Sequence, residues 1–206
     1  ITADVGAVAT GAFGIGQSSW GNIYVGSPLS GAWTATGNVT FNYNRMSLAL
    51  GNGIVVKTTG AVTYQPSASS FSAAQTFPAN AFSVLATNAS SLTIGKSGNT
   101  GDITIGTTQS VAGPISVYGG TITLNANLTS TASGDISLYS DAALAGLSST
   151  RTITTSGAFK YIPQSTSFSS AVTFPISNLT LTNVTGVEVG KIGNTAGVTI
   201  GSATSV

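Results

Sequence analysis

Cysteine and histidine are absent from the sequence, methionine occurs once, and charged residues are rare. Six Lys/Arg and five Asp/Glu among 206 residues make 5% of the chain, whereas about a quarter of an ordinary soluble domain is charged. Without Cys or His, the sequence excludes disulfide scaffolds, thiol nucleophiles, Ser-His-Asp triads and the usual zinc, haem and iron–sulfur sites. The formal net charge of +1 offers no basic surface to nucleic acid. We therefore expect no cofactor, no metal site and no nucleic-acid partner.

Long hydrophobic runs are also missing. A membrane-spanning helix needs about 18 or more consecutive apolar residues, and Gly, Ser, Thr or Asn interrupts every charge-free stretch of this chain. Disorder is disfavoured as well, because 41% of the residues are apolar and the net charge is small. We expect a folded chain with a sizeable core and no membrane insertion.

Glycine, serine and threonine make up about two-fifths of the chain, and apolar residues alternate with the small polar ones. A period of two in β-branched residues predicts half-buried strands. Turn-forming pairs such as Gly98-Asn99 and Gly193-Asn194 separate these strands. The sequence therefore predicts an all-β fold. The clearest strand segments are 92–94, 103–105, 115–117, 122–124, 136–138, 179–181 and 198–200.

The chain repeats itself at a spacing of about 97 residues. Segment 60–78 matches 157–175 at eleven of nineteen positions, and 95–106 matches 190–201 at eight of twelve. The offset is 97 for the first pair and 95 for the second, which places a deletion in a loop between Pro175 and Gly190. The chain thus contains a partial repeat over about 1–36, a complete one over 37–133 and a partial one over 134–206.

Strand signals run across every repeat boundary without a linker. This continuity, together with the shortness of the strands, favours one β-solenoid over residues 1–206 rather than separate sandwiches. Coils of roughly 20–24 residues would give four or five coils per repeat and nine or ten in total. Because like charges stacked at about 4.8 Å repel, whereas Thr, Ser and Asn columns do not, stacking also accounts for the rarity of charge. Ile1 is not an initiator Met and no signal peptide follows, so we interpret the chain as a segment of a longer protein.

Three segments resemble a known family. They are 112–128, with Ala112-Gly113-Pro114-Ile115-Ser116-Val117-Tyr118-Gly119-Gly120, and the shorter Gly134-Asp135-Ile136-Ser137-Leu138 and Gly101-Asp102-Ile103-Thr104-Ile105-Gly106. In repeat style and composition they are similar to large secreted bacterial proteins related to filamentous haemagglutinin. The resemblance implies a right-handed parallel β-helix, secretion to the cell surface, and a structural role in adhesins, biofilm fibres or scaffolds.

The resulting expectation is a structural fibre or stalk segment of a secreted bacterial adhesin or matrix filament, without enzymatic activity. Its partners would be neighbouring repeats or copies of itself, end to end, and glycans or proteins of host or cell surfaces. One alternative is a self-assembling extracellular filament subunit. Among possible surface contacts, Trp20, Tyr24 and Trp33 crowd the N-terminal fifth and could form a glycan platform, although such aromatics more often fill a core.

Two further alternatives depend on particular side chains. A carbohydrate-active β-helix would need Asp135, Asp141 and Arg151 to converge in one groove, whereas Asp135 is equally explained as a turn residue. An ice-binding solenoid would need Thr-x-Thr pairs at one place on nearly every coil. The pairs at 121/123, 152/154 and 180/182 are too widely spaced in the sequence to occur on every coil, and Leu92-Thr93-Ile94 interrupts the pattern.

Overall fold

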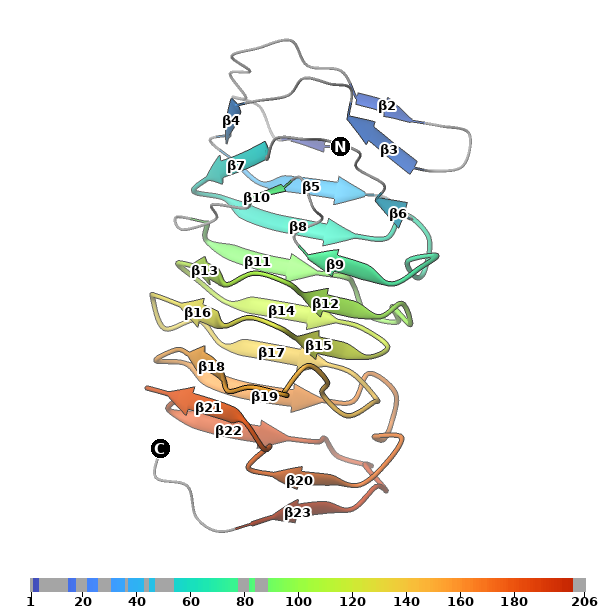
Figure 1. Cartoon of the computed structure of the whole chain (residues 1–206), viewed down its shortest axis with the longest axis vertical. Coiled ribbons are helices and arrows are strands. Elements are labelled where there is room, and N and C mark those ends of the chain that lie inside the picture. The colour runs from blue at the N-terminus through green and yellow to red at the C-terminus, as the bar shows by residue number, and fades with distance from the viewer. Residues whose placement is uncertain are drawn as a thin grey trace.

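The computed structural model describes residues 2–3, 15–17, 22–25, 31–35, 37–42, 45–46, 54–77, 82–83 and 89–201. These residues contain strands and turns and no helix, so no helix among them could cross a membrane. Parallel strands stack into a β-solenoid that runs from the N-terminal to the C-terminal end of the molecule (Figure 1). The predicted all-β, parallel solenoid fold is confirmed.

One sheet, which we call face 1, continues along the whole solenoid. Its parallel strands are β5 (Val39–Asn42), β8 (Ala61–Gln65), β11 (Ser91–Ile94), β14 (Ile115–Tyr118), β17 (Ile136–Tyr139), β19 (Ala158–Ile162) and β22 (Gly186–Val189). Between successive face-1 strands the chain passes along two further sides of the solenoid, so that each coil turns three times; in the coil from β17 to β19, one of these sides holds the isolated bridge residue Ala145 in place of a strand. About six turns separate β5 from β22.

The other two sides of the solenoid are built from shorter sheets. One side holds β9 (Gln75–Phe77), β12 (Ile103–Ile105) and β15 (Ile122–Leu124), with β20 (Val172–Phe174) and β23 (Val198–Ile200) as a separate pair. The four-stranded sheet that we call face 3 consists of β13 (Gln109–Val111), β16 (Leu128–Ser130), β18 (Arg151–Thr154) and β21 (Leu179–Thr182).

The N-terminal coils add strands to the same stack. β3 (Asn22–Val25) pairs with β6 (Arg45–Met46), and parallel pairs also join β4 (Gly31–Ala35), β7 (Ile54–Thr58) and β10 (Phe82–Ser83). Among the strands the structure describes, the antiparallel pairs are those of β1 (Thr2–Ala3) with β5 and β2 (Ile15–Gln17) with β3.

Coil lengths follow from the strand register of face 1. The equivalent residues on successive strands are Val39, Val62, Leu92, Ile115, Ile136, Phe159 and Val187, so the coils are unequal in length. The two coils that begin at Val62 and Phe159 are longer than predicted, and each contains an extra loop, 66–74 or 163–171, between its first two strands. Val62 and Phe159 are the same offset apart as the sequence repeats and are separated by four coils, so one sequence repeat is four coils.

The core lies between the sheets and is filled mainly by alternate residues of the strands from β8 to β20. All seven segments that alternation singled out are strands. Residues such as Leu92, Ile103, Ile122 and Leu138 are fully buried, and each contributes about 1.5–3 kcal/mol of stability through burial. Aromatic residues fill the wider coils: Tyr64 stacks on Phe41 with ring centroids 4.6 Å apart, and Phe71, Phe77, Phe168 and Phe174 are buried as well.

Glycines form a column at the corner that leads into face 1. A Cβ atom on Gly60 would lie 2.4 Å from the carbonyl carbon of Gly37, and one on Gly113 would lie 1.8 Å from the Ser90 oxygen. Gly134 is equally crowded, against the backbone of Gly113 and Pro114. At these three glycines an added Cβ atom would clash with the backbone of the preceding coil, so a side chain does not fit at these positions. Part of the high glycine content is therefore a requirement of stacking.

An asparagine clasp closes each long coil. The Oδ1 atom of the fully buried Asn99 accepts hydrogen bonds from Ser70 Oγ (2.9 Å) and Phe71 N (3.0 Å). In the second repeat, Asn194 Oδ1 accepts the same bonds from Ser167 Oγ (2.8 Å) and Phe168 N (2.9 Å). The two most similar segments of the repeat thus contact each other in space. The clasp holds the extra loop against the next coil.

Candidate functional site

The aromatic residues proposed as a glycan platform fall in the N-terminal coils. Trp20 lies outside the described residues. Tyr24 and Trp33 belong to β3 and β4, of which the structure describes the backbone alone. The glycan contact at these three residues therefore stays a prediction.

The three side chains of the carbohydrate-active alternative make separate contacts. Asp135 directly precedes β17 and Asp141 follows it, so that the whole strand, roughly 13 Å long, lies between them. Asp141 Oδ1 accepts a hydrogen bond from Ser165 N (2.8 Å), and Arg151 Nε donates to the Leu124 carbonyl (3.1 Å). The structure does not bring Asp135 and Asp141 together in a groove.

Acidic and amide side chains instead connect successive coils. Asn38, Asp102 and Asp135 each precede a strand, and in each an Oδ1 atom accepts a backbone N–H from the next coil, at 2.8, 2.7 and 2.9 Å. Asn127 Oδ1 makes the same contact with Thr152 N (2.9 Å). These residues extend the inter-coil ladder at places where the backbone turns a corner. For Asp135, which the sequence also explained as a turn residue, the structure shows this contact between coils.

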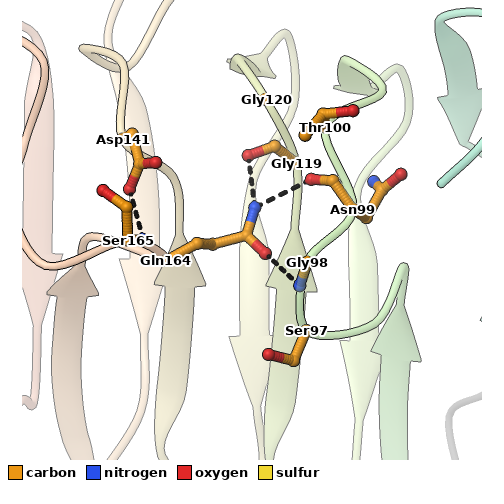
Figure 2. A pocket seen from close by; sticks show the side chains of 9 residues that line it. All are labelled: Ser97, Gly98, Asn99, Thr100, Gly119, Gly120, Asp141, Gln164 and Ser165. Atoms are coloured by element: carbon orange, nitrogen blue, oxygen red, sulfur yellow. Dashed lines mark hydrogen bonds between the residues drawn. The ribbon is translucent and has the colours of Figure 1, made fainter. Parts of the chain in front are cut away.

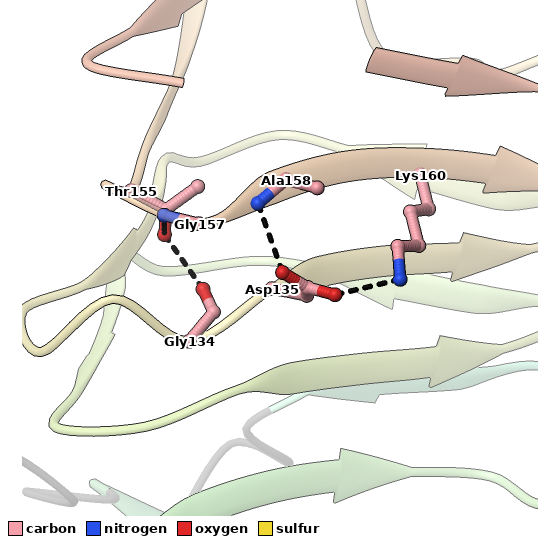
Figure 3. A network of polar contacts seen from close by, with 6 residues as sticks. All are labelled: Gly134, Asp135, Thr155, Gly157, Ala158 and Lys160. Atoms are coloured by element: carbon pink, nitrogen blue, oxygen red, sulfur yellow. Dashed lines mark hydrogen bonds and ion pairs between the residues drawn. The ribbon is translucent and has the colours of Figure 1, made fainter. Parts of the chain in front are cut away.

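Asp135 also makes the ion pair of this region. Lys160 Nζ lies 2.6 Å from Asp135 Oδ2, and both side chains are about a third exposed, at 32% and 40% respectively (Figure 3). Hydrogen bonds from Lys160 and then from Ala158 N hold the pKa of Asp135 below its usual range. The carboxylate in turn raises the pKa of Lys160. The ion pair favours the charged forms of both side chains, so neither is available as a free acid or base.

A hollow of about 310 Å³ opens at the other end of face 1, among the turns that follow its strands (Figure 2). Gln164 spans it: its Oε1 accepts from Gly98 N (3.0 Å), while its Nε2 donates to the carbonyls of Asn99 (2.8 Å) and Gly119 (2.9 Å). Its lining residues are Ser97, Gly98, Asn99, Thr100, Gly119, Gly120, Asp141, Gln164 and Ser165. Within the described residues, no three His, Cys, Asp or Glu side chains are grouped so as to hold a metal ion.

Sequence reasoning missed Gln164, and no pattern in the sequence would have found it. Its counterpart at the equivalent position of the first repeat is Ser67. Gln164 follows β19 yet contacts the turns after β11 and β14, so its loop passes the β17 coil. Gln164 makes this contact through both atoms of its side-chain amide. It fixes the loop rather than leaving a side chain free for chemistry.

Two of the three Thr-x-Thr pairs stack on each other, although their wide spacing in the sequence suggested that they would not. Thr152 and Thr154 of β18 stand in register with Thr180 and Thr182 of β21 on face 3. Thr121 precedes β15 and Thr123 lies within it, on another side of the solenoid. Leu92-Thr93-Ile94 belongs to face 1. The segment at 92–94 therefore does not interrupt the pattern on face 3, because coil length varies and linear spacing does not report the face.

Face 1 carries a polar column that contains charged residues in addition to Thr and Ser. The strand register stacks in this column Thr40, Thr63, Thr93, Ser116, Ser137, Lys160 and Glu188, of which Ser137 is buried. Beside this column Tyr118 and Tyr139 stack in parallel with centroids 4.3 Å apart, and burial together with Tyr139 raises the pKa of Tyr118. The predicted hydroxyl columns are present, and where charges do stack, Lys160 meets Glu188 with opposite sign.

A comparison of the chain with family models, curated proteins and solved structures found no match in any of the three.

Proposed function

We propose that this chain is a structural fibre or stalk segment of a secreted bacterial adhesin or extracellular matrix filament, which mediates cell-surface or cell-cell attachment. The observation that carries the proposal is face 1, whose strands stack in parallel over about six turns without interruption. A solenoid of this kind is extended by adding repeats, because each coil contacts mainly its neighbours. Length is the property that a stalk must supply.

Three features of the solenoid suit a mechanical role. Backbone hydrogen bonds between coils run along the long axis, so a pull along that axis loads many of them at once. The asparagine clasps and the corner contacts recur at an interval of four coils, so the same stabilising contacts are repeated along the axis. The outer columns are mostly Thr and Ser, which can lie close to another surface without charge repulsion.

The finer parts of the proposal rest on the resemblance to the filamentous haemagglutinin family and on the sequence pattern. They are a right-handed winding, nine or ten coils over the whole chain, and secretion to the outside of the cell. The partners proposed are further repeats of the same protein along the axis, and host or cell-surface glycans or proteins at its sides.

Localisation on the source bacterium tests this proposal directly. Antibodies raised against the 206-residue chain should label intact cells, and brief protease treatment of those cells should remove the label. An internal deletion of the segment from the chromosomal gene should reduce attachment to surfaces or to other cells. Labelling that appears only after the cells are permeabilised would overturn the proposal.

An in-register duplication tests the solenoid as a length module. A second copy of residues 62–158 inserted before Phe159 adds four coils, because Val62 and Phe159 occupy equivalent positions. We expect the rod to lengthen by about 19 Å, four coils of about 4.8 Å each, measured by small-angle X-ray scattering. An insert of the same length made of Gly and Ser is the control, and it should add a flexible loop without lengthening the rod.

A self-assembling filament subunit is the second candidate, favoured by the apolar residues of the last described coil. Val187, Ile192 and Ile200 are 37%, 102% and 68% exposed. A following coil, from the same protein or from a second copy, would cover this end. Electron micrographs of the purified 206-residue chain decide the point: end-to-end filaments support the subunit, and dispersed short rods support a segment covered by its own continuation.

A further inference from the structure

Two columns of short polar side chains run side by side on face 3. The first contains Ser110, Thr129, Thr154 and Thr182, which the strand register places directly above one another. The second, two positions earlier in each strand, contains Asn127, Thr152 and Thr180. We call these seven residues the threonine face. It covers the stacked strands β13, β16, β18 and β21 (Figure 1).

The seven side chains point away from the core. The residues between them in the strands point inward: Leu128 is fully buried and Ile153 is 1% exposed. Asn127 and Thr180 are exposed, and the other members of the two columns are half-buried by their stacked neighbours. Lateral packing restricts their rotation, so their outer atoms are held in a regular array.

The hydroxyl groups of the threonine face are not used by the protein. In the part of the chain that the structure describes, none of its six Ser and Thr hydroxyls makes a side-chain hydrogen bond, whereas those of Thr58, Thr155, Ser70 and Ser167 all do. Each free hydroxyl can both donate and accept. The array is therefore open to an external network of hydrogen bonds.

The threonine face is also uncharged and free of aromatic rings. The nearest charged side chain, Arg151, occupies an inward-facing register position of β18, and its Nε donates to the Leu124 carbonyl. Face 1 differs in both respects, since its column contains Lys160 and Glu188 and the Tyr118–Tyr139 pair lies beside it. A neutral array suits a neutral partner, and a sugar polymer would gain more from the ring faces that face 3 lacks.

We propose that the threonine face binds ice. The array repeats in two directions, about 4.8 Å from coil to coil and about 6.6 Å along each strand, and ice is a neutral hydrogen-bonded lattice that repeats in two directions on the same scale. The Thr methyl groups restrict the orientation of adjacent water, while the free hydroxyls join the ordered layer. This activity is separate from the role of the solenoid as a stalk, and either can fail without the other.

Thermal hysteresis of the 206-residue chain tests the inference. The unmodified chain should lower the freezing point below the melting point and should shape growing ice crystals. The variant Thr154→Tyr places a ring at the centre of the face, between Thr129 and Thr182, and should lose most of this activity. The matched control is Thr93→Tyr, which alters a half-buried Thr in the column of face 1, between Thr63 and Ser116, and should retain it.

Folding is checked for each variant by circular dichroism. If Thr154→Tyr fails to fold, Thr154→Lys replaces it, since a lysine can extend its ammonium group into solvent. No hysteresis and no crystal shaping by the unmodified chain overturns the inference. So does an equal loss in the face-1 and face-3 variants, or binding to crystalline cellulose or chitin without any effect on ice.

Discussion

The same corner occurs twice in the molecule, four coils apart. In the first repeat Thr58 Oγ1 donates to the Gly37 carbonyl (2.5 Å) and accepts from Gly60 N (2.9 Å). In the second, Thr155 Oγ1 donates to the Gly134 carbonyl (2.6 Å) and accepts from Gly157 N (2.9 Å) (Figure 3). Both threonines are almost fully buried, at 5% and 1% exposure.

On the surface of the two corners, a pair of neighbouring residues is uncharged in the first repeat and charged in the second. The first corner has Asn38 and Thr63, and the second has Asp135 and Lys160 at the equivalent places. Both acceptors bond the N–H of an alanine in the next coil, but only the second is also part of an ion pair. Buried contacts are thus kept between repeats, whereas the exposed pair is free to become charged.

The largest expected effect comes from filling the glycine column. Gly60→Ala should destabilise the chain by about 3 kcal/mol, because its Cβ would lie 2.4 Å from a backbone carbon of Gly37. Gly157→Ala should cost less, about 1–2 kcal/mol, since the closest atoms lie at 2.8 and 2.9 Å. Guanidinium unfolding followed by circular dichroism measures both.

Gly186→Ala is the matched control for the glycine column. Its Cβ would meet only the Ala158 Cβ, at the ordinary distance of 3.9 Å. We expect its unfolding midpoint to be close to that of the unmodified chain. A control variant as unstable as Gly60→Ala would show that loss of glycine flexibility, rather than the clash with the preceding coil, sets the cost.

The buried threonines give the next largest effect. Thr155→Val keeps the shape of the side chain but removes its hydroxyl, which leaves Gly157 N without its partner. We expect a loss of about 1–3 kcal/mol, and the same loss for Thr58→Val, measured by the same unfolding experiment. If the two repeats are equivalent at this corner, the two values agree; a clear difference between them would contradict that equivalence.

The ion pair gives the smallest effect, no more than about 1 kcal/mol because both groups are partly exposed and screened. The pKa of Asp135 is lower in the folded chain than in the unfolded chain. Its stabilisation is therefore present above the unfolded pKa of about 4 and is lost as the pH falls through the folded pKa. The unfolding midpoint of the unmodified chain should fall more steeply below pH 4 than that of Asp135→Asn.

Introducing the ion pair into the first corner extends the comparison between the two repeats. The double variant Asn38→Asp with Thr63→Lys should give the first corner a similar acid-dependent stabilisation, because the backbone bond to Ala61 N is already in place. A double-mutant cycle isolates the coupling between the two new charges. Absence of any coupling would mean that the ion pair needs surroundings that only the second repeat supplies.

The strands and the repeat could be predicted from the sequence because they depend on local alternation. The triplets at 92–94 and 136–138 are strands, as expected, and one sequence repeat is four coils. The bridging role of Gln164 could not be predicted, since its partners after β11 and β14 are distant in the sequence and its counterpart is Ser67.

The sequence by itself determined an all-β chain of short stacked strands, poor in charge and rich in glycine, because alternation and turn residues act over a few neighbouring positions. Tertiary structure alone decided which residues share a face. Loops of different length make the coils unequal, so Thr154 and Thr182 meet in register on face 3 although the coil between them is one of the longer ones. The physical reason is that backbone hydrogen bonds between successive coils determine which residues stack, whatever the number of residues in each coil.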